Sequence, residues 1–559
     1  MKKQTLVLVA ILILATALRF WNLGKVPAST TNDEAAIIYN AYSIAKTGKD
    51  IAGIFLPTSI NLDNSFSPVY MYIAAPFVGL LGISLSSGRL PFAIMGVLGI
   101  YIMYLFVKAL TKRESVALAS AFIVAVSPWH LALTRMANDA PTALFFSLIG
   151  LYIFTSQVRS KRLLWSLPFF FLAFYSYHAT KVYLIGQFVI LLLAFRKELL
   201  NSKKLAIIFI TSMVTMLLIF LLFSQKMGIT RQSVFIWNHP ENAARFVDFE
   251  RNNNSAPYWM MPIFNNKPLY YLRIIRENFL ESFSMNYLFL YGETGGISDI
   301  FSVHFRGSFY IIELLFLIFG IVALIRKPTE RTGFIIGSLL ISTLPSTFTE
   351  DKAIVTRNIM MLPFFAIIMG YGVDSCIEFV KACRRPIGIA IISIGASWYL
   401  FLILGFLYQY HYRFSIYGAE AWFRSHRDLS EYILANSSAY QNIWVAKTGY
   451  MFLLQYGIYG RIDPKNIQRA FAQKWPKTIG NLTLFDDCID TQETAFDPNL
   501  FLPPNTLYIV PPECYPNDIP PEPNTIRQVG EPLRIMRKIY KSTPSNVNDI
   551  NHLDESTKK

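Results

Sequence analysis

The sequence predicts a mainly α-helical, polytopic membrane protein that carries a small α/β domain near its C-terminal end. Of the 559 residues, 53% are hydrophobic and only 16% are charged, whereas an ordinary soluble chain has about 25% charged residues. The charges gather in short basic clusters between long apolar runs, which is the pattern of membrane-crossing helices. The net charge of +15 therefore indicates no nucleic-acid partner, because Lys and Arg do not collect on one soluble face.

Apolar runs of near-spanning length recur from the N-terminus to residue 408. A helical span needs about 20 residues, with about 17 as the lower end, and flanking residues complete a short run. The runs are Thr5–Phe20, Pro68–Ile83, Leu90–Leu110, Ser115–Ser127, Pro141–Thr155, Leu163–Tyr175, Val182–Phe195, Leu205–Phe223, Ser308–Ile325, Gly333–Leu344, Ile354–Val373 and Ile387–Tyr408. The first run resembles a signal peptide, but we interpret it as an uncleaved first span against which later spans pack.

The basic clusters indicate which runs cross the membrane. They are Lys2/Lys3, Lys108/Lys112/Arg113, Arg159/Lys161/Arg162, Arg196/Lys197/Lys203/Lys204, Arg326/Lys327/Arg331 and Lys381/Arg384/Arg385. All of them fall on the cytoplasmic side only if Pro68–Ile83 does not cross. That run carries Pro76, and we interpret it as a juxtamembrane or re-entrant helix buried against protein. The prediction is about 11 transmembrane helices, with the N-terminus in the cytoplasm.

This topology divides the chain into three predicted parts. Residues 1–410 form the transmembrane domain, with a first outer loop at 19–89 and a long polar outer loop at 225–307. Residues 411–541 form an extracytoplasmic α/β domain, and residues 542–559 form a polar, disordered tail.

The predicted α/β domain contains one helix and several short strands. Ala419–Ala435 has the apolar stripe of a helix, and strands are expected at Asn442–Thr448, Thr506–Val510 and Arg534–Tyr540. Cys488 and Cys514 lie in this domain. They either form a disulfide or remain free thiols.

Acidic residues follow the first span and occur again in the second outer loop. Asp33 and Glu34 begin a predicted helix, where Asp33 or Asn32 could serve only as a helix cap and Glu34 could favour the positive helix end. Asp139 follows Asn138 in the second outer loop, and capping is again the plain alternative.

Basic residues lie on the same predicted membrane face. They are Arg135, His178, Lys181 and Arg357. Taken singly, each suits packing or a side chain that extends to the membrane interface. Taken together, they form a cationic pocket suited to a phosphate whose lipid tail lies in the bilayer, and a neighbouring carboxylate could deprotonate an acceptor hydroxyl.

Several motifs carry a family resemblance that covers roughly residues 1–375. They are Arg19-Phe20, Asn22-Leu23-Gly24, Pro27, Asp33-Glu34-Ala35, Thr47-Gly48-Lys49-Asp50, Arg89-Leu90-Pro91, the series Ser127-Pro128, Arg135 and Asp139, and the run Phe289–Glu293. With these motifs the chain resembles the C-superfamily (GT-C) glycosyltransferases. The nearest branch is that of the protein O-mannosyltransferases and lipid A aminoarabinose transferases, which is glycosyltransferase family 39-like.

The resemblance implies a GT-C fold and a role for each candidate. Asp33 matches the catalytic acidic residue and would be the general base, Glu34 would support it, and Asp139 matches the second-loop acidic residue. The donor phosphate would be bound by Arg135, His178, Lys181 and Arg357. No cofactor is required by this scheme, although a divalent metal between Asp33 and Asp139 is an open alternative.

The implied reaction transfers a sugar from a polyprenyl-phosphate donor to an acceptor hydroxyl on the outer face of the membrane. The acceptor could be a protein, a lipid or a polysaccharide. A phosphate leaves without a protonating acid, so one base suffices, unlike the carboxylate pair of a glycosidase. The main alternative is a transporter or flippase of lipid-linked glycans, which the scarcity of ionisable residues within the spans disfavours. A third alternative is a glycan-binding scaffold.

Overall fold

The structure is a computed structural model, and it describes residues 3–62, 65–201, 203–223, 234–293, 300–303, 305–350, 354–488, 502–514, 525–527 and 535–541. The predicted tail at 542–559 lies outside these residues. The chain divides into two units. The helical unit comprises Met1–Leu23, Thr58–Ile73 and Arg89–Tyr412, and the C-terminal unit comprises Gly24–Pro57, Ala74–Gly88 and Arg413–Lys559. We describe each unit by itself.

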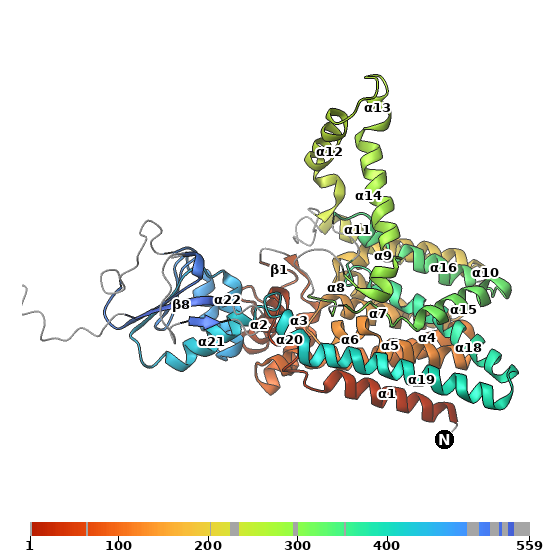
Figure 1. The fold of residues 1–559 in the computed structure, drawn as a ribbon, viewed down its shortest axis with the longest axis horizontal. Coiled ribbons are helices and arrows are strands. Elements are labelled where there is room, and N and C mark those ends of the chain that lie inside the picture. The colour runs from red at the N-terminus through yellow and green to blue at the C-terminus, as the bar shows by residue number, and fades with distance from the viewer. Residues whose placement is uncertain are drawn as a thin grey trace, which may run out of the picture. The chain divides into compact units, whose positions relative to one another are not determined.

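Each apolar run of the sequence forms or contains a helix (Figure 1). The helices are α1 (Lys3–Phe20), α3 (Val69–Leu81), α4 (Leu85–Thr111), α5 (Glu114–Val126), α7 (Asp139–Gln157), α8 (Ser166–Ser176), α9 (His178–Ala194), α11 (Lys203–Phe223), α15 (Glu313–Arg326), α16 (Thr332–Ile341), α18 (Leu362–Ala382) and α19 (Arg385–Tyr408). The mainly helical fold class is therefore confirmed.

Five helices of the described residues are long and apolar enough to cross a membrane, or six if a bent pair counts as one span. The bent pair consists of α5 and α6 (Pro128–Thr134), which meet at an angle of 58°. Ser127 and Pro128 lie at the break, and a proline is well suited to the first position of a new helix. The predicted number of about 11 transmembrane helices remains a prediction.

Helix α18 lies at the centre of the helical unit, where it packs against α5, α15 and α16. Its contact with α15 is close because both helices carry glycine at the crossing. A Cβ atom added to Gly320 would lie 1.9 Å from the Ile368 carbonyl oxygen, and one added to Gly372 would lie 1.8 Å from the Phe316 carbonyl oxygen. Any larger side chain at either position would push the two backbones apart.

The predicted outer loop at 225–307 is largely helical where it is described. Helices α12 (Pro240–Asn252) and α14 (Lys267–Glu281) form a hairpin with the short α13 (Met261–Phe264) at its end, and this hairpin stands out from the rest of the helical unit (Figure 1). Phe246 and Tyr270 join the two arms, with ring centroids 5.1 Å apart.

The C-terminal unit contains a six-stranded sheet with strand order β4-β5-β3-β6-β8-β7. The strands are β3 (Asn442–Val445), β4 (Lys477–Ile479), β5 (Leu482–Leu484), β6 (Thr506–Val510), β7 (Thr525–Arg527) and β8 (Ile535–Lys541). β3 pairs in parallel with both β5 and β6, while the pairings β4-β5, β6-β8 and β7-β8 are antiparallel. The three predicted strands correspond to β3, β6 and β8.

The helices of the C-terminal unit include two that the sequence analysis did not predict. The predicted helix Ala419–Ala435 is present as α21 (Arg424–Asn436), with a turn in place of its first residues, whereas α22 (Tyr450–Tyr459) and α23 (Pro464–Ala472) were not expected. Cys488 and Cys514 form a disulfide, with their Cα atoms 5.7 Å apart. Of the two alternatives, a disulfide or two free thiols, the structure has the disulfide.

Part of the predicted first outer loop belongs to the C-terminal unit. Residues 24–57 and 74–88 lie in this unit, although the sequence analysis assigned 19–89 to the transmembrane domain. Helix α2 (Asn32–Thr47) packs against α22 and α23. The contact with α22 is close because a Cβ atom at Gly457 would lie 2.4 Å from the Tyr39 ring.

Candidate active site

Asp33 and Glu34 lie in the first turn of α2, but neither of them caps this helix. Thr31 is the N-cap, and its hydroxyl accepts a hydrogen bond from the Glu34 N–H at 3.1 Å. The alternative that Asn32 or Asp33 is the cap is therefore wrong. Asp33 is half-buried and Glu34 is fully buried. The carboxylate of Asp33 is thus held at the positive end of a helix without being used as its cap.

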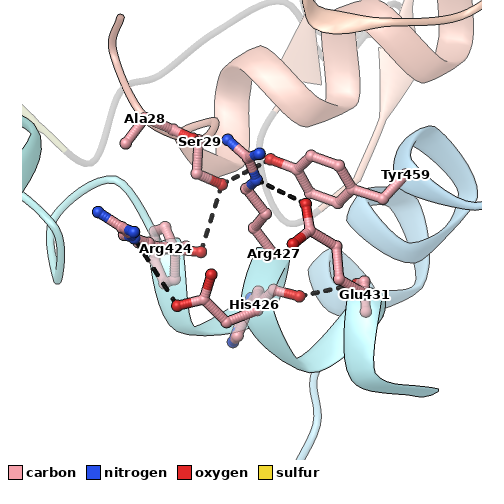
Figure 2. A network of polar contacts seen from close by, with 10 residues as sticks. Ala28, Ser29, Arg424, His426, Arg427, Glu431 and Tyr459 are labelled. Carbon is pink, nitrogen blue, oxygen red and sulfur yellow. Dashed lines mark hydrogen bonds and ion pairs between the residues drawn. The ribbon is translucent and has the colours of Figure 1, made fainter. Parts of the chain in front are cut away.

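The segment that leads into α2 is bound by the C-terminal part of the same unit (Figure 2). The Arg427 guanidinium donates a hydrogen bond to the Ala28 carbonyl at 2.8 Å and is paired with Glu431 at 2.8 Å. The hydroxyl groups of Ser29 and Tyr459 are 2.7 Å apart. These contacts fix the backbone a few residues ahead of Asp33.

The buried side-chain amide of Gln455 holds the next residue of this segment, Thr30. The Gln455 side-chain amide donates to the Thr30 hydroxyl at 3.0 Å, and its oxygen accepts from the Nδ1 of His426 at 2.6 Å. Thr30 and Gln455 are both fully buried. Because a buried polar group without a partner costs about 1–3 kcal/mol, these bonds strongly favour one position of residue 30 over others.

Asp50 follows the other end of α2 and is also buried. Its Oδ1 accepts a hydrogen bond from the Ile54 N–H at 2.8 Å, whereas its Oδ2 has no partner among the described residues. Burial raises the pKa of Asp50, although backbone N–H groups counteract part of that effect. The Asp50 carbonyl in turn accepts from the Gln468 amide of α23 at 2.9 Å.

In the helical unit, Asp139, His178 and Lys181 come together. Asp139 begins α7 and Asn138 caps that helix, since its side chain accepts from the Ala140 N–H at 2.9 Å. The Lys181 ammonium lies 3.4 Å from the Nδ1 of His178 and is attracted by the charge of Asp139. Lys181 is only 6% exposed, so this cation is largely withdrawn from water.

Arg135 is fully buried, and the suggestion that it extends to the membrane interface is therefore wrong. Its guanidinium donates to the carbonyl groups of Leu18 and Arg19 at 2.8 and 2.9 Å and lies 5.3 Å from the centre of the Tyr410 ring. Arg135 thus satisfies carbonyl groups at the C-terminal end of α1.

Arg19 joins α1 to the break between α5 and α6. Its guanidinium donates to the Ala125 carbonyl at 3.0 Å and the Thr134 hydroxyl at 3.1 Å, and it lies 2.7 Å from the Nδ1 of His130. All of these groups are buried, so the bend in the chain is held by hydrogen bonds rather than by apolar packing alone.

Arg357 lies in the segment that precedes α18. Its guanidinium donates to the Thr349 hydroxyl at 2.8 Å. The same segment is fixed to α6, because the Trp129 indole donates to the Val355 carbonyl at 2.8 Å. The structure therefore places Arg357 beside Thr349.

The described residues contain no group of three His, Cys, Asp or Glu side chains arranged to hold a metal ion. Asp33 and Asp139, which the sequence analysis considered as metal ligands, belong to different units.

This chain is similar to a protein family and to several solved structures. Residues 65–224 match the model of the dolichyl-phosphate-mannose-protein mannosyltransferase family. No curated protein matches the sequence. ArnT from Cupriavidus metallidurans, solved in complex with undecaprenyl phosphate, is similar over 95% of this chain and 97% of its own, with 11% identity and a TM-score of 0.51. That likeness shows the GT-C fold. The chain thus has the GT-C fold, and residues 65–224 resemble a family of glycosyltransferases.

Two other glycosyltransferases show weaker likenesses. The oligosaccharyltransferase AglB from Archaeoglobus fulgidus, in complex with an inhibitory peptide and a dolichol-phosphate, is similar over 82% of this chain and 63% of its own, with 13% identity and a TM-score of 0.47. The chain thus spans less than two thirds of AglB. The Pmt1-Pmt2 complex of S. cerevisiae is similar over 46% of this chain and 38% of that chain, with 18% identity and a TM-score of 0.32.

The residues that hold the segment before Asp33 were not predicted from the sequence. Gln455 is the one amide in the otherwise apolar helix Tyr450–Tyr459, and an isolated buried amide needs partners. That signal was available in the sequence, but it did not identify the partner. Arg427 carried no such signal, because a lone Arg on a surface helix normally points to solvent.

Proposed function

We propose that this protein is a glycosyltransferase, which moves a sugar from a polyprenyl-phosphate donor to an acceptor hydroxyl on the outer face of the membrane. The reaction inverts the configuration of the anomeric carbon, and Asp33 is the general base. The observation that carries the proposal is the setting of Asp33. Its half-buried carboxylate lies in the first turn of α2, where Thr31 already caps the helix. Helix capping therefore does not account for this carboxylate, and we assign it the catalytic role.

The donor class is supported by the chemistry of the helical unit. ArnT was solved with undecaprenyl phosphate, and we extend that ligand class to this chain as a proposal. The Lys181 ammonium donates to the His178 Nδ1 and lies near Asp139, and such a donor suits a phosphate oxygen. We assign Arg357 to the same phosphate and give Arg135 a positioning role, because its guanidinium already binds the end of α1.

The proposed reaction is a single displacement. The acceptor oxygen forms a bond to the anomeric carbon while the bond from that carbon to the phosphate oxygen breaks, and the hydroxyl proton passes to the Asp33 carboxylate. Glu34 supports Asp33, and the cations stabilise the charge that grows on the departing phosphate. Because the phosphate leaves as an anion, no second acid has to protonate it.

Asp33→Asn tests the base directly. The purified variant should release sugar from a polyprenyl-phosphate donor about 10²- to 10⁴-fold more slowly than the wild type, the usual contribution of a general base. Asp463→Asn is the matched control. Asp463 caps α23 in the same unit by accepting from the Lys465 N–H at 2.8 Å, and Asn caps a helix equally well. Equal activity of Asp33→Asn and the wild type would contradict the proposal.

The same assay separates the alternatives. A flippase would move the lipid-linked glycan without releasing polyprenyl phosphate, so turnover without release would point to transport. Product configuration measured by NMR tests inversion. Activity measured with and without EDTA tests the proposal that no divalent metal is required. Candidate protein, lipid and polysaccharide acceptors supplied in parallel identify the acceptor.

A further inference from the structure

A cavity of about 280 Å³ lies in the helical unit, among the ends of α4, α7 and α9. Its lining includes Lys112, Arg159 and Arg331. Each comes from a different basic cluster of the sequence, and these clusters mark the face that the positive-inside distribution predicts to be cytoplasmic. That distribution explains why the face is basic. It does not explain why three cations surround one cavity.

One of the three cations is already neutralised. Arg331 forms an ion pair with Glu198, donates to the Ala194 carbonyl at 3.0 Å and lies 4.0 Å from the centre of the Phe195 ring. Burial alone would raise the pKa of Glu198, but the hydrogen bond from Arg331 and the attraction of Arg159 lower it. Glu198 thus remains charged and balances Arg331, which forms a fixed wall of the cavity.

The other two cations are exposed at the cavity. Neighbouring cations on this face have acidic partners of their own, since Lys108 pairs with Glu114 at 2.8 Å and Arg113 with Asp374 at 3.2 Å. Lys112 and Arg159 form no ion pair with any part of the chain that the structure describes. They leave the cavity with a positive charge that the protein does not balance.

The backbone of Lys112 gives an independent indication. Its φ is +58°, and its N–H donates to the Lys108 carbonyl at 3.0 Å, where it ends α4. Glycine or asparagine normally takes this left-handed position, because a β-carbon is disfavoured there. Lys112 adopts this conformation despite the local backbone strain, and its long cationic side chain lies at the cavity.

We propose that this cavity binds the phosphate group of an anionic ligand, with Lys112 and Arg159 as its charged contacts. An anionic phospholipid headgroup and free phosphate share this chemistry, and basic pockets between transmembrane helices bind such headgroups. The site is separate from the proposed sugar transfer and does not depend on it.

The test uses the purified full-length protein in a neutral detergent. Native mass spectrometry would measure binding of dioctanoyl phosphatidylglycerol, of dioctanoyl phosphatidylcholine with the same tails, and of inorganic phosphate. The double variant Lys112→Gln and Arg159→Gln should weaken phosphatidylglycerol or phosphate binding about 10- to 30-fold. The matched control, Lys161→Gln with Arg162→Gln, removes the same charge from exposed residues that do not line the cavity.

Each result has a definite meaning. If the cavity variant, but not the control variant, loses phosphatidylglycerol binding, the proposal is supported with a lipid as the source of the phosphate group. If the cavity variant, but not the control variant, loses binding of inorganic phosphate, the proposal is supported with free phosphate as the source. Equal loss in both double variants, or loss in neither, overturns it. Lys112→Gly separates charge from folding, because glycine accepts the backbone conformation. This variant should be at least as stable as the wild type and still bind more weakly.

Discussion

Gln455 provides the sharpest test of how the segment before Asp33 is held. The substitution Gln455→Leu keeps the approximate volume of the side chain but removes its amide. The Thr30 hydroxyl and carbonyl then lose a donor that lies 3.0 and 3.3 Å away, and His426 loses an acceptor at 2.6 Å. The partners are separated by 425 residues in the chain, so the effect depends on tertiary structure alone.

The expected cost follows from burial. Leaving a fully buried polar group without its partner costs about 1–3 kcal/mol, and the loss at His426 adds about 1 kcal/mol. The total is about 3 kcal/mol, which corresponds to a roughly 100-fold larger population of the locally opened state. This opening would expose the first turn of α2.

Hydrogen–deuterium exchange measures that population directly. In Gln455→Leu, amides at the start of α2 should exchange about 100-fold faster than in the wild type, while amides of α18 should not change. Tyr459→Phe removes the hydroxyl group that contacts Ser29 and should accelerate the same amides about fivefold. If α2 exchanged at the wild-type rate in Gln455→Leu, the support that we assign to this amide would be refuted.

Three further predictions concern the C-terminal unit, each with a thermal melt as its readout. Burial raises the pKa of Asp50, so the wild type loses stability as the pH rises through that pKa. The melting temperature of the wild type relative to Asp50→Asn should therefore be higher at about pH 4.5 than at about pH 7. A difference in melting temperature that does not change with pH would contradict this. Replacing Cys488 and Cys514 by Ser opens a loop with a sequence separation of 26 and should cost about 3 kcal/mol, whereas an unchanged melt in reductant would argue against the bond. Lys477 donates to three carbonyl groups at the end of α23, so Lys477→Met should cost about 1–2 kcal/mol, and a neutral effect would show that water replaces the ammonium group.

Much of the helical unit could be predicted because each apolar run is a local signal. Long runs must bury their backbone groups in helices when they lie in lipid, and the structure has a helix in each of them. The bend between α5 and α6 had a visible cause in Pro128, but the angle did not. That angle is stabilised by Arg19, whose partners are distant in sequence.

Two helices of the C-terminal unit were missed for different reasons. Tyr450–Tyr459 is buried on nearly all sides, so it lacks the alternating polar face that identifies an amphipathic helix. Pro464–Ala472 was recognisable, because Asp463 followed by Pro464 is a typical helix start. The predicted phosphate-binding role of the cations stays a prediction. Arg135 donates to backbone carbonyl groups, and no sequence pattern indicates those bonds.

The hydrogen bonds between residues 28–50 and the last part of the chain have a consequence for how the protein folds during synthesis. Ribosomes extend a chain at about 5–20 residues per second, and N-terminal regions normally fold first. Here the segment that carries Asp33 cannot complete its hydrogen bonds until Gln455 and Gln468 have been synthesised. An unfinished or prematurely terminated chain would therefore lack the contacts that position the segment carrying Asp33, and under the proposed function it would be inactive.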